Sequence, residues 1–444
     1  MNTATLAAIV MVSIIVVTLV LGFPIGISIG IGAFAGVMCV MPFDKAAFQS
    51  AQKYFMGANS FSLLAIPFFI LAGNLMNSGG IAKRLIGLAR VVAHIFPGEL
   101  AQTNIVANML FGAVSGSGVA AASAMGSIIG PMEKEAGYDE AYSAAANIAS
   151  GPTGMMIPPS NIMIVYATVA SGTSIAALFM AGYVPGILWG VLCMVWAGIV
   201  AKKRGYVSHD KYSLAKIGKL LIEGIPSVLM IVVVIGGILF GFFTATEGSA
   251  IAVVYSLVVG MLYKSIKVKE LPKMLLETVK TTAVVEFMVC VSGIMGYIMT
   301  YARIPQLVAN AVLGISSSPI IILLIMNVIL LIVGCFMDPT PAVLIFTPIF
   351  LPIVQKFGMD SVHFGLMMVM NLCVGTLTPP VGAILFAGCR IANISIDKVI
   401  KDLVPYFVMV AIALILVTFI PALSLGLPKL LGLVKYTGPM WFIG

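Results

Sequence analysis

The chain has 444 residues, of which 61% are hydrophobic and only 9% are charged, and its mean hydropathy is +1.13. A soluble fold would have too few polar groups to cover its surface, so this composition predicts an all-α polytopic membrane protein. The net charge of +8 does not indicate nucleic-acid binding, because the basic residues crowd into two connectors. The six cysteines stand singly in apolar stretches, which argues against a disulfide framework and against a metal site.

The first element expected in chain order is a membrane-spanning helix from Leu6 to Phe23. The residues before it carry no positively charged region, and the apolar run has no small-residue cleavage pattern. We therefore expect a retained span and not a removable signal.

Three basic residues, Lys83, Arg84 and Arg90, alternate with apolar residues at helical spacing. This pattern is typical of an amphipathic helix that lies at the membrane surface. We expect its basic residues to contact membrane lipids of negative charge, with a role in substrate binding as the alternative.

A run of small and flexible residues, Gly-Ala-Val-Ser-Gly-Ser-Gly, occupies positions 112–118 between apolar flanks. Such a run continues a helix poorly, so it predicts the tip of a re-entrant helical hairpin inside the membrane. Close packing of straight helices through small residues is the alternative interpretation.

Two further interruptions share the pattern G-x-x-x-P-P, at Gly154–Pro159 and Gly375–Pro380, which lie 221 positions apart (375 minus 154). Glycine is flexible and proline lacks a backbone N–H, so each pattern predicts a broken helix, near residues 151–160 and 375–382. Non-helical backbone survives at membrane depth only where protein buries it or where it lines a polar cavity. Matched breaks therefore indicate a transporter's binding site, with ordinary diproline loops as the alternative.

Two connectors are rich in lysine, one between residues 202 and 219 and the other between residues 264 and 273. Basic connectors of this length are typical of the cytoplasmic side of a membrane. Two expected spans, roughly Ile225–Thr244 and Ala250–Tyr263, separate the connectors and return the chain to the same side.

The two breaks belong to an internal duplication. Three more residue pairs keep the spacing of 221 positions: Pro131 with Pro352, Gly137 with Gly358, and Asp139 with Asp360. We expect a first repeat over residues 1–201, a basic cytoplasmic linker over 202–224, a second repeat over 225–428 and a C-terminal tail over 429–444. The second hairpin tip falls near residues 334–341, where Asp338 is an acidic residue at membrane depth.

Each hairpin tip, together with its broken helix, offers oxygen atoms to a small cation. Unwound carbonyl groups can replace the hydration shell of sodium, and a restarting helix points its positive dipole end at an anion. A sodium ion and a carboxylate would then bind close together and attract each other. The candidates for substrate binding neighbour the breaks and are Ser117, Ser160, Asn161 and Asp338.

Four segments carry a resemblance to a known family: Gly241–Ala250, Gly334–Pro339, Thr347–Pro352 and Gly375–Gly382. They include G-x-x-T-x-T-E and T-P-P-V-G, and through them the chain resembles the large membrane subunit of the tripartite ATP-independent periplasmic (TRAP) transporters over nearly its whole length. The resemblance implies two inverted repeats and an elevator-type mechanism. It also implies a bacterial inner-membrane location and two protein partners, a small four-helix membrane subunit and a periplasmic substrate-binding protein.

Carried over position by position, the resemblance implies two sodium-binding sites. The first comprises Ser115, Ser117, Gly154, Ile157 and Pro159. The second comprises Gly334, Met337, Gly375, Thr378 and Val381. The side chains of methionine and valine cannot bind sodium, so two positions of the second site can offer only their carbonyl groups.

The expected function is sodium-coupled uptake of an organic acid anion, such as a C4-dicarboxylate, sialic acid or a related sugar acid, without an organic cofactor. A stand-alone sodium/anion symporter or antiporter of similar design is one alternative, and a cation channel is another. An intramembrane serine protease would need a base beside Ser117, and none of His94, His209 and His363 stands where it could activate that hydroxyl. The chain is therefore not expected to be an enzyme.

Overall fold

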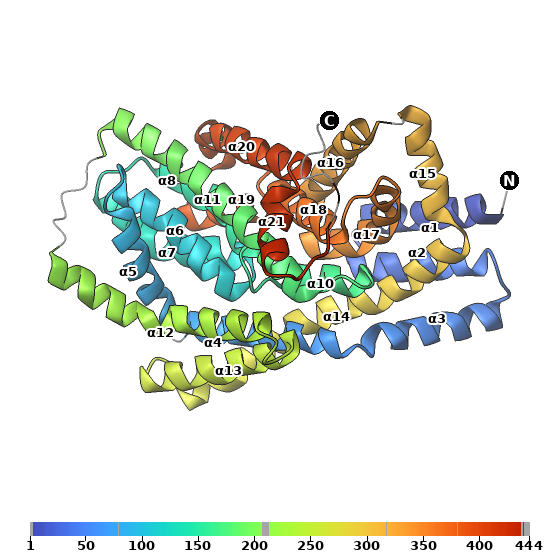
Figure 1. The fold of residues 1–444 in the computed structure, drawn as a ribbon, viewed down its shortest axis with the longest axis horizontal. Coiled ribbons are helices and arrows are strands. Elements are labelled where there is room, and N and C mark those ends of the chain that lie inside the picture. The colour runs from blue at the N-terminus through green and yellow to red at the C-terminus, as the bar shows by residue number, and fades with distance from the viewer. Residues whose placement is uncertain are drawn as a thin grey trace.

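The computed structural model of the protein describes residues 3–78, 80–206, 213–316, 318–379, 381–436 and 438. Every regular element in this part of the chain is a helix, as Figure 1 shows. Seven helical segments are long and apolar enough to cross a membrane: Phe61–Ser78, Ile175–Arg204, Leu214–Leu239, Ala245–Leu262, Val268–Tyr301, Pro319–Phe336 and Ile396–Phe419. The predicted all-α polytopic membrane protein is confirmed.

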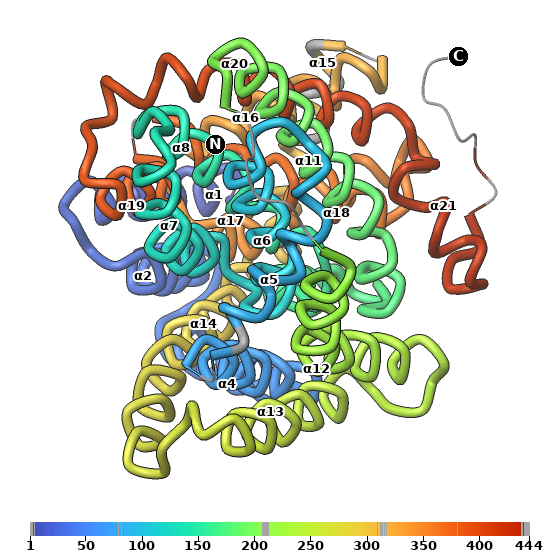
Figure 2. The backbone as a smooth tube through the Cα atoms, turned by 90° about the vertical axis from the view of Figure 1, so that its left-hand side faces the viewer, coloured from blue at the N-terminus to red at the C-terminus, as the bar shows by residue number. Residues whose placement is uncertain are grey.

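One group of helices forms an outer frame. Helix α14 packs against α2, α3 and α4, and α4 packs against α13, so frame helices from both halves of the chain lie side by side. In Figure 2, α4, α12, α13 and α14 lie together below the remaining helices. The frame comprises α1 (Thr3–Val20), α2 (Ile25–Met38), α3 (Phe43–Ala58), η1 (Phe61–Leu64), α4 (Ala65–Ser78), α5 (Ile81–Ala93), α12 (Leu214–Leu239), α13 (Ala245–Leu262), η2 (Val268–Glu270), α14 (Leu271–Tyr301) and α15 (Ile304–Ile315).

The other helices form a second group, which we call the hairpin body. Here α7 packs against α19, α8 against α20, and α10 against α17, so each of these contacts joins the two halves of the chain. The hairpin body comprises α6 (Glu99–Ser115), α7 (Gly118–Glu135), α8 (Glu140–Ser150), α9 (Thr153–Met156), α10 (Asn161–Val169), α11 (Ile175–Arg204), α16 (Pro319–Phe336), α17 (Pro339–Gln355), α18 (Ser361–Gly375), α19 (Ala383–Ala392), α20 (Ile396–Phe419) and α21 (Ala422–Leu430).

Within the hairpin body the two halves repeat their elements in the same order. Helices α7 and α17 begin 221 positions apart (339 minus 118), and α8 and α18 begin at the same spacing (361 minus 140). Helices α10 and α19 begin 222 positions apart (383 minus 161). The element order thus follows the spacing found in the sequence. The expected domain boundaries and the inversion of one repeat stay predictions.

The frame differs from the expected one in two places. Helix α12 begins at Leu214, inside the segment assigned to the linker, because the hydroxyl of Ser213 accepts a hydrogen bond from the Lys216 N–H and caps the helix. Helix α3 was not expected, since its charged and amide side chains make it too polar to resemble a membrane span. Linker residues 207–212 and tail residues 437 and 439–444 lie outside the described residues.

Polar contacts at the end of α11 join three helices of the hairpin body. The Arg204 guanidinium lies 3.2 Å from the Asp139 carboxylate and 2.5 Å from the Asp402 carboxylate, which links α11 to the start of α8 and to α20. The rings of Tyr138 and Tyr206 stack beside this ion pair, with their centroids 4.3 Å apart. The start of α8 is thereby fixed, and its other end leads into the first broken helix.

Candidate functional site

The first hairpin tip is a short interruption between α6 and α7. Helix α6 ends at Ser115, and Gly116 follows in a left-handed conformation (φ 61°), which glycine adopts without strain. Ser117 then caps α7, because its hydroxyl accepts a hydrogen bond from the Ala120 N–H at 3.3 Å. The tip therefore comprises only Gly116 and Ser117, and not the whole predicted range of residues 112–118. The prediction was too long because serine and glycine are tolerated in the last turn of α6.

The second tip has the same design with different residues. Helix α16 ends at Phe336, Met337 is extended, and Asp338 caps α17 by accepting a hydrogen bond from the Thr340 N–H at 3.0 Å. Pro339 occupies the first turn of α17, where a missing N–H costs nothing. The carboxylate that the sequence placed at membrane depth thus faces the positive end of a helix.

The first broken helix meets the first hairpin through two glycines. A Cβ atom on Gly154 would overlap the backbone of Gly112, and a Cβ on Gly112 would overlap the backbone of Gly154. After this contact α9 ends at Met156, the Pro158–Pro159 peptide bond is cis, and α10 begins at Asn161. The non-helical stretch of residues 157–160 contains two of the carbonyl groups that the resemblance assigns to sodium, those of Ile157 and Pro159, whereas Gly154 lies within α9.

The second half repeats this glycine contact. A Cβ on Gly375 would overlap the backbone of Gly334, and the Gly382 N–H donates a hydrogen bond to the Cys335 carbonyl at 3.2 Å. The Thr378 hydroxyl donates to a carbonyl in the last turn of α18 at 2.9 Å. The structure therefore brings the hairpin and broken-helix members of the second expected sodium site together. Pro380 of the diproline pattern lies outside the described residues.

A cavity of about 1030 Å³ opens between the two tips. Ser117 and Asp338, one from each tip, line it together with Asn161 at the start of α10. The amide oxygen of Asn161 is buried without a hydrogen-bond partner, so it is available to a ligand. Ser160 is not among the lining residues. It is fully buried, and its hydroxyl donates a hydrogen bond to the Met155 carbonyl at 2.5 Å.

Residues 12–423 match the family described as tripartite ATP-independent periplasmic transporter, DctM component. The chain belongs to this family. Transporters of this kind combine the large permease with a small membrane subunit and a periplasmic binding protein. The relatives are named as transporter permeases, so the protein is a transporter and not an enzyme, and it is a multi-pass protein of the inner membrane.

Three relatives match this permease over most of both chains. The Salmonella typhimurium protein YgiK is 48% identical, over 93% of this chain and 95% of its own length. The C4-dicarboxylate TRAP transporter large permease protein DctM of Pseudomonas aeruginosa is 38% identical, over 90% and 94%. The sialic acid TRAP transporter large permease protein SiaM of Vibrio cholerae is 36% identical, over 92% and 95%.

The fold also matches a solved structure. The YdaH transporter of Alcanivorax borkumensis superposes with a TM-score of 0.62, covering 90% of this chain and 91% of its own, at 13% sequence identity. At that identity the match concerns the fold alone.

The frame contributes residues to the cavity that the sequence analysis missed. Lys280 and Thr281 of α14 and Asn77 of α4 line the cavity from the side of the frame. Among the lining residues, Lys280 and Asp338 are the two that carry charge. The sequence contains little signal for Lys280, because its neighbours include Glu277, Glu286 and several threonines and do not form a purely apolar run.

A second cavity, of about 1100 Å³, adjoins the first on the side of α5. The two cavities share Asn77 and Ala120 as lining residues. Lys83 and Arg84 line the second cavity, and the guanidinium of Arg84 lies 3.4 Å from the centroid of the Tyr263 ring. In the permease, these two basic residues therefore lie on the wall of this cavity, and Lys83 is also exposed. The expected contact with lipids stays a prediction.

We expect Gly154→Ala to destabilise the permease, because its methyl group must displace the backbone of Gly112. Overpacking of this kind typically costs about 1–3 kcal/mol. Thermal unfolding of the purified protein in detergent measures the effect.

The matched control is Gly130→Ala on α7, where a Cβ would meet no atom within 4 Å. It should unfold at or slightly above the wild-type temperature, because alanine favours a helix more than glycine does. A Gly154→Ala protein with wild-type stability would show that the glycine contact is not tight.

Proposed function

We propose that this permease carries an organic acid anion into the cell together with sodium ions, through the cavity between the hairpin tips. The observation that supports the proposal most is that Ser117 and Asp338, from tips in different halves of the chain, line one cavity together with Lys280. Each tip, with its broken helix, would hold a cation, and the lysine would attract a carboxylate.

Sodium would bind where each hairpin contacts its broken helix. The glycine contacts hold each hairpin against the helix that ends at its break, and carbonyl and hydroxyl oxygens are the ligands that a small hard cation prefers. We assign to the first site Ser115, Ser117, Gly154, Ile157 and Pro159. We assign to the second site Gly334, Met337, Gly375, Thr378 and Val381.

The substrate would be an anion with at least one carboxylate. The Pseudomonas aeruginosa and Vibrio cholerae relatives are named for C4-dicarboxylates and for sialic acid, which share this group. The carboxylate would lie near Lys280, while Ser117 and Asn161 would bond to its other polar groups. Asp338 would repel a carboxylate directly, so it would accept hydrogen bonds from substrate hydroxyls or stabilise a cation.

The other two components would divide the remaining tasks. A periplasmic binding protein would deliver the anion, and a small four-helix subunit would pack with the frame and hold it in the membrane. The hairpin body would then move against the frame in an elevator-type step. In the present conformation, the second cavity would continue the route of the anion toward the cytoplasm, along the α7 face that includes Ala120 and toward Lys83 and Arg84.

Reconstitution into proteoliposomes tests this function. The permease, its small subunit and its binding protein would be assayed with radiolabelled succinate and N-acetylneuraminate as probes. We expect uptake of an anion only with an inward sodium gradient and with the binding protein present. Uptake by the permease alone would support a stand-alone symporter or antiporter, and passive sodium flux without bound anion would support a channel.

Replacing Ser117 with alanine should weaken the sodium dependence of uptake, because one hydroxyl ligand is lost. A net loss of about 1 kcal/mol corresponds to roughly a fivefold higher sodium concentration for half-maximal uptake. Ser127→Ala on the same helix is the control, since that hydroxyl donates to the Ala124 carbonyl and lies away from the tip. Unchanged sodium dependence in Ser117→Ala would remove this hydroxyl from the site.

Replacing Lys280 with glutamine should raise the KM for the anion by about tenfold, as expected for the loss of roughly 1.4 kcal/mol of attraction. Sodium dependence should stay unchanged, because this lysine belongs to neither proposed sodium site. The control is Lys273→Gln, which removes an exposed lysine in the first turn of the same helix α14. If both variants showed the wild-type KM, Lys280 would not contact the substrate.

A further inference from the structure

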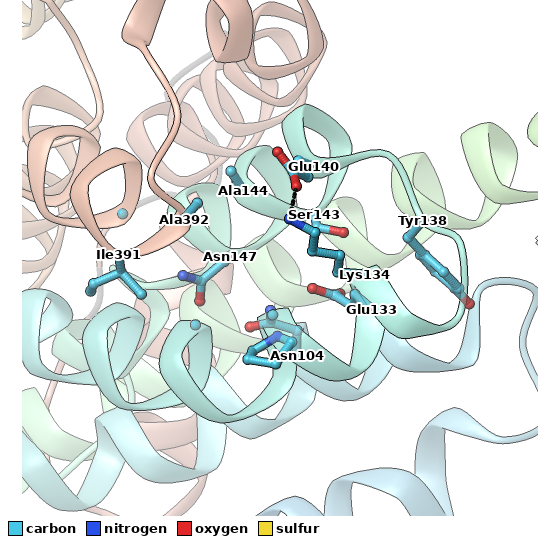
Figure 3. Close-up of a pocket in the computed structure, with 14 residues that line it drawn as sticks. Asn104, Glu133, Lys134, Tyr138, Glu140, Ser143, Ala144, Asn147, Ile391 and Ala392 are labelled. Atoms are coloured by element: carbon cyan, nitrogen blue, oxygen red, sulfur yellow. Dashed lines mark ion pairs between the residues drawn. The ribbon is translucent and has the colours of Figure 1, made fainter.

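A smaller cavity of about 240 Å³ lies in the hairpin body between α6, α7, α8 and α19. It is separate from the cavity between the tips and shares no lining residue with it. Figure 3 shows Glu133 of α7, Asn104 of α6 and Ser143 of α8 with their side chains directed toward the same space. The transport mechanism proposed above does not use this cavity.

Glu133 is a buried carboxyl group with no cationic partner. Its residue is 1% exposed, and no ion pair reaches it in the described part of the chain. Its neighbour Lys134 points outward and pairs with Glu140 at 2.6 Å, as the dashed line in Figure 3 marks. Burying an ionised carboxylate without a counter-charge is costly, so the group must be stabilised in another way.

Three unpaired polar atoms surround this position. They are Oε1 of Glu133, Nδ2 of Asn104 and Oγ of Ser143, each buried without a hydrogen-bond partner. The amide N–H of Asn104 and the hydroxyl of Ser143 can both donate, so either form of the carboxyl group can find partners here. Burial decides between the two forms, because no cation reaches Glu133 in the described part of the chain to offset the cost of a buried charge.

A chain of polar side chains leads from this cavity toward the first broken helix. The amide of Asn108 donates to the Asn104 Oδ1 at 3.1 Å and to the Ser150 hydroxyl at 2.9 Å. The Ser150 carbonyl in turn accepts a hydrogen bond from the Thr153 hydroxyl at 2.6 Å. Thr153 opens α9, directly before the glycine contact at the break. Asn104 thus lines the cavity that contains Glu133 and is also the first member of the hydrogen-bonded chain that leads to the break.

We propose that Glu133 is a proton-binding site of the hairpin body, built from the buried polar cavity and connected to the first broken helix by the Asn104–Asn108–Ser150 chain. On ionisation the proton would pass to water that enters the cavity, and the resulting carboxylate would loosen the packing of α7 on α8. The ligand of this site is therefore a proton, not the transported anion.

The other charged groups near the cavity do not supply a counter-charge to Glu133. Glu140 on α8 is engaged with Lys134, and Glu99 on α6 pairs with Arg90 at 3.4 Å. Tyr138 lines the cavity from the turn before α8, and the α19 residues that line it are apolar or glycine. Glu133 lies in the last turn of α7, outside the candidate spans, where burial raises its pKa to about 8 and the polar groups of Ser143 and Asn104 act in the opposite direction.

The sign of the effect on stability follows from this pKa. The folded protein holds a proton that the unfolded chain releases near the ordinary value of 4.5, so the contribution is present at low pH and is lost as the pH rises through about 8. We expect the melting temperature of the purified permease to fall between about pH 5 and about pH 8, and Glu133→Gln to lose that fall. An equal fall in both proteins would overturn the proposal.

The matched control is Glu135→Gln, which removes an exposed carboxyl group from the same helix and should keep the wild-type fall. A second measurement is direct and covers the case in which Glu133→Gln folds poorly. Infrared spectroscopy of the wild type at neutral pH should show the carbonyl stretch of a protonated, buried carboxylic acid that disappears at alkaline pH. Its absence would overturn the proposal. Both measurements need neither sodium nor substrate, so their outcome is independent of the proposed transport function.

Discussion

The structure depends on the requirement that backbone polar groups inside a membrane find partners within the protein. Helices are broken at two places here, and each break is covered by a hairpin whose backbone touches it through a glycine pair. Gly112 with Gly154 and Gly334 with Gly375 leave no room for a side chain. Because the backbones are this close, each hairpin packs directly on the helix that ends at its break. The cavity between the tips lies beside these two contacts and is lined by Ser117 of one tip and Asp338 of the other.

Local chemistry made much of this site predictable. Helix-breaking residues at a repeated spacing identified both broken helices, and the helix restarts fell where the caps Ser160 and Gly382 place them. The lengths of the two tips were overestimated, since small residues continue a helix when neighbouring helices pack on them. Helix α3 was missed because its charged and amide side chains make it too polar to resemble a membrane span, and a local pattern does not record its packing on α14.

Long-range proximity accounts for the residues that the sequence did not reveal. Lys280 reaches the cavity only because α14 crosses the hairpin tips, and no motif near it indicates that crossing. Glu133 lies in an ordinary surface-like stretch beside Lys134, yet it is buried because α6 and α8 close over it. Ser160 shows the opposite case. Its position beside a break indicated a ligand contact, whereas the fold turns its hydroxyl onto the Met155 carbonyl.

The exchange of contacts between the two halves has a consequence for how the protein is made. Helices α7, α8 and α10 leave the ribosome long before α17, α19 and α20, on which they pack. Until those later helices are inserted, the first break lacks part of its protein covering. The helix faces that will later pack against the second half are exposed to lipid. The first half therefore reaches its final packing only after the later helices have entered the membrane, and assembly of the membrane domain ends when its last helices are in place.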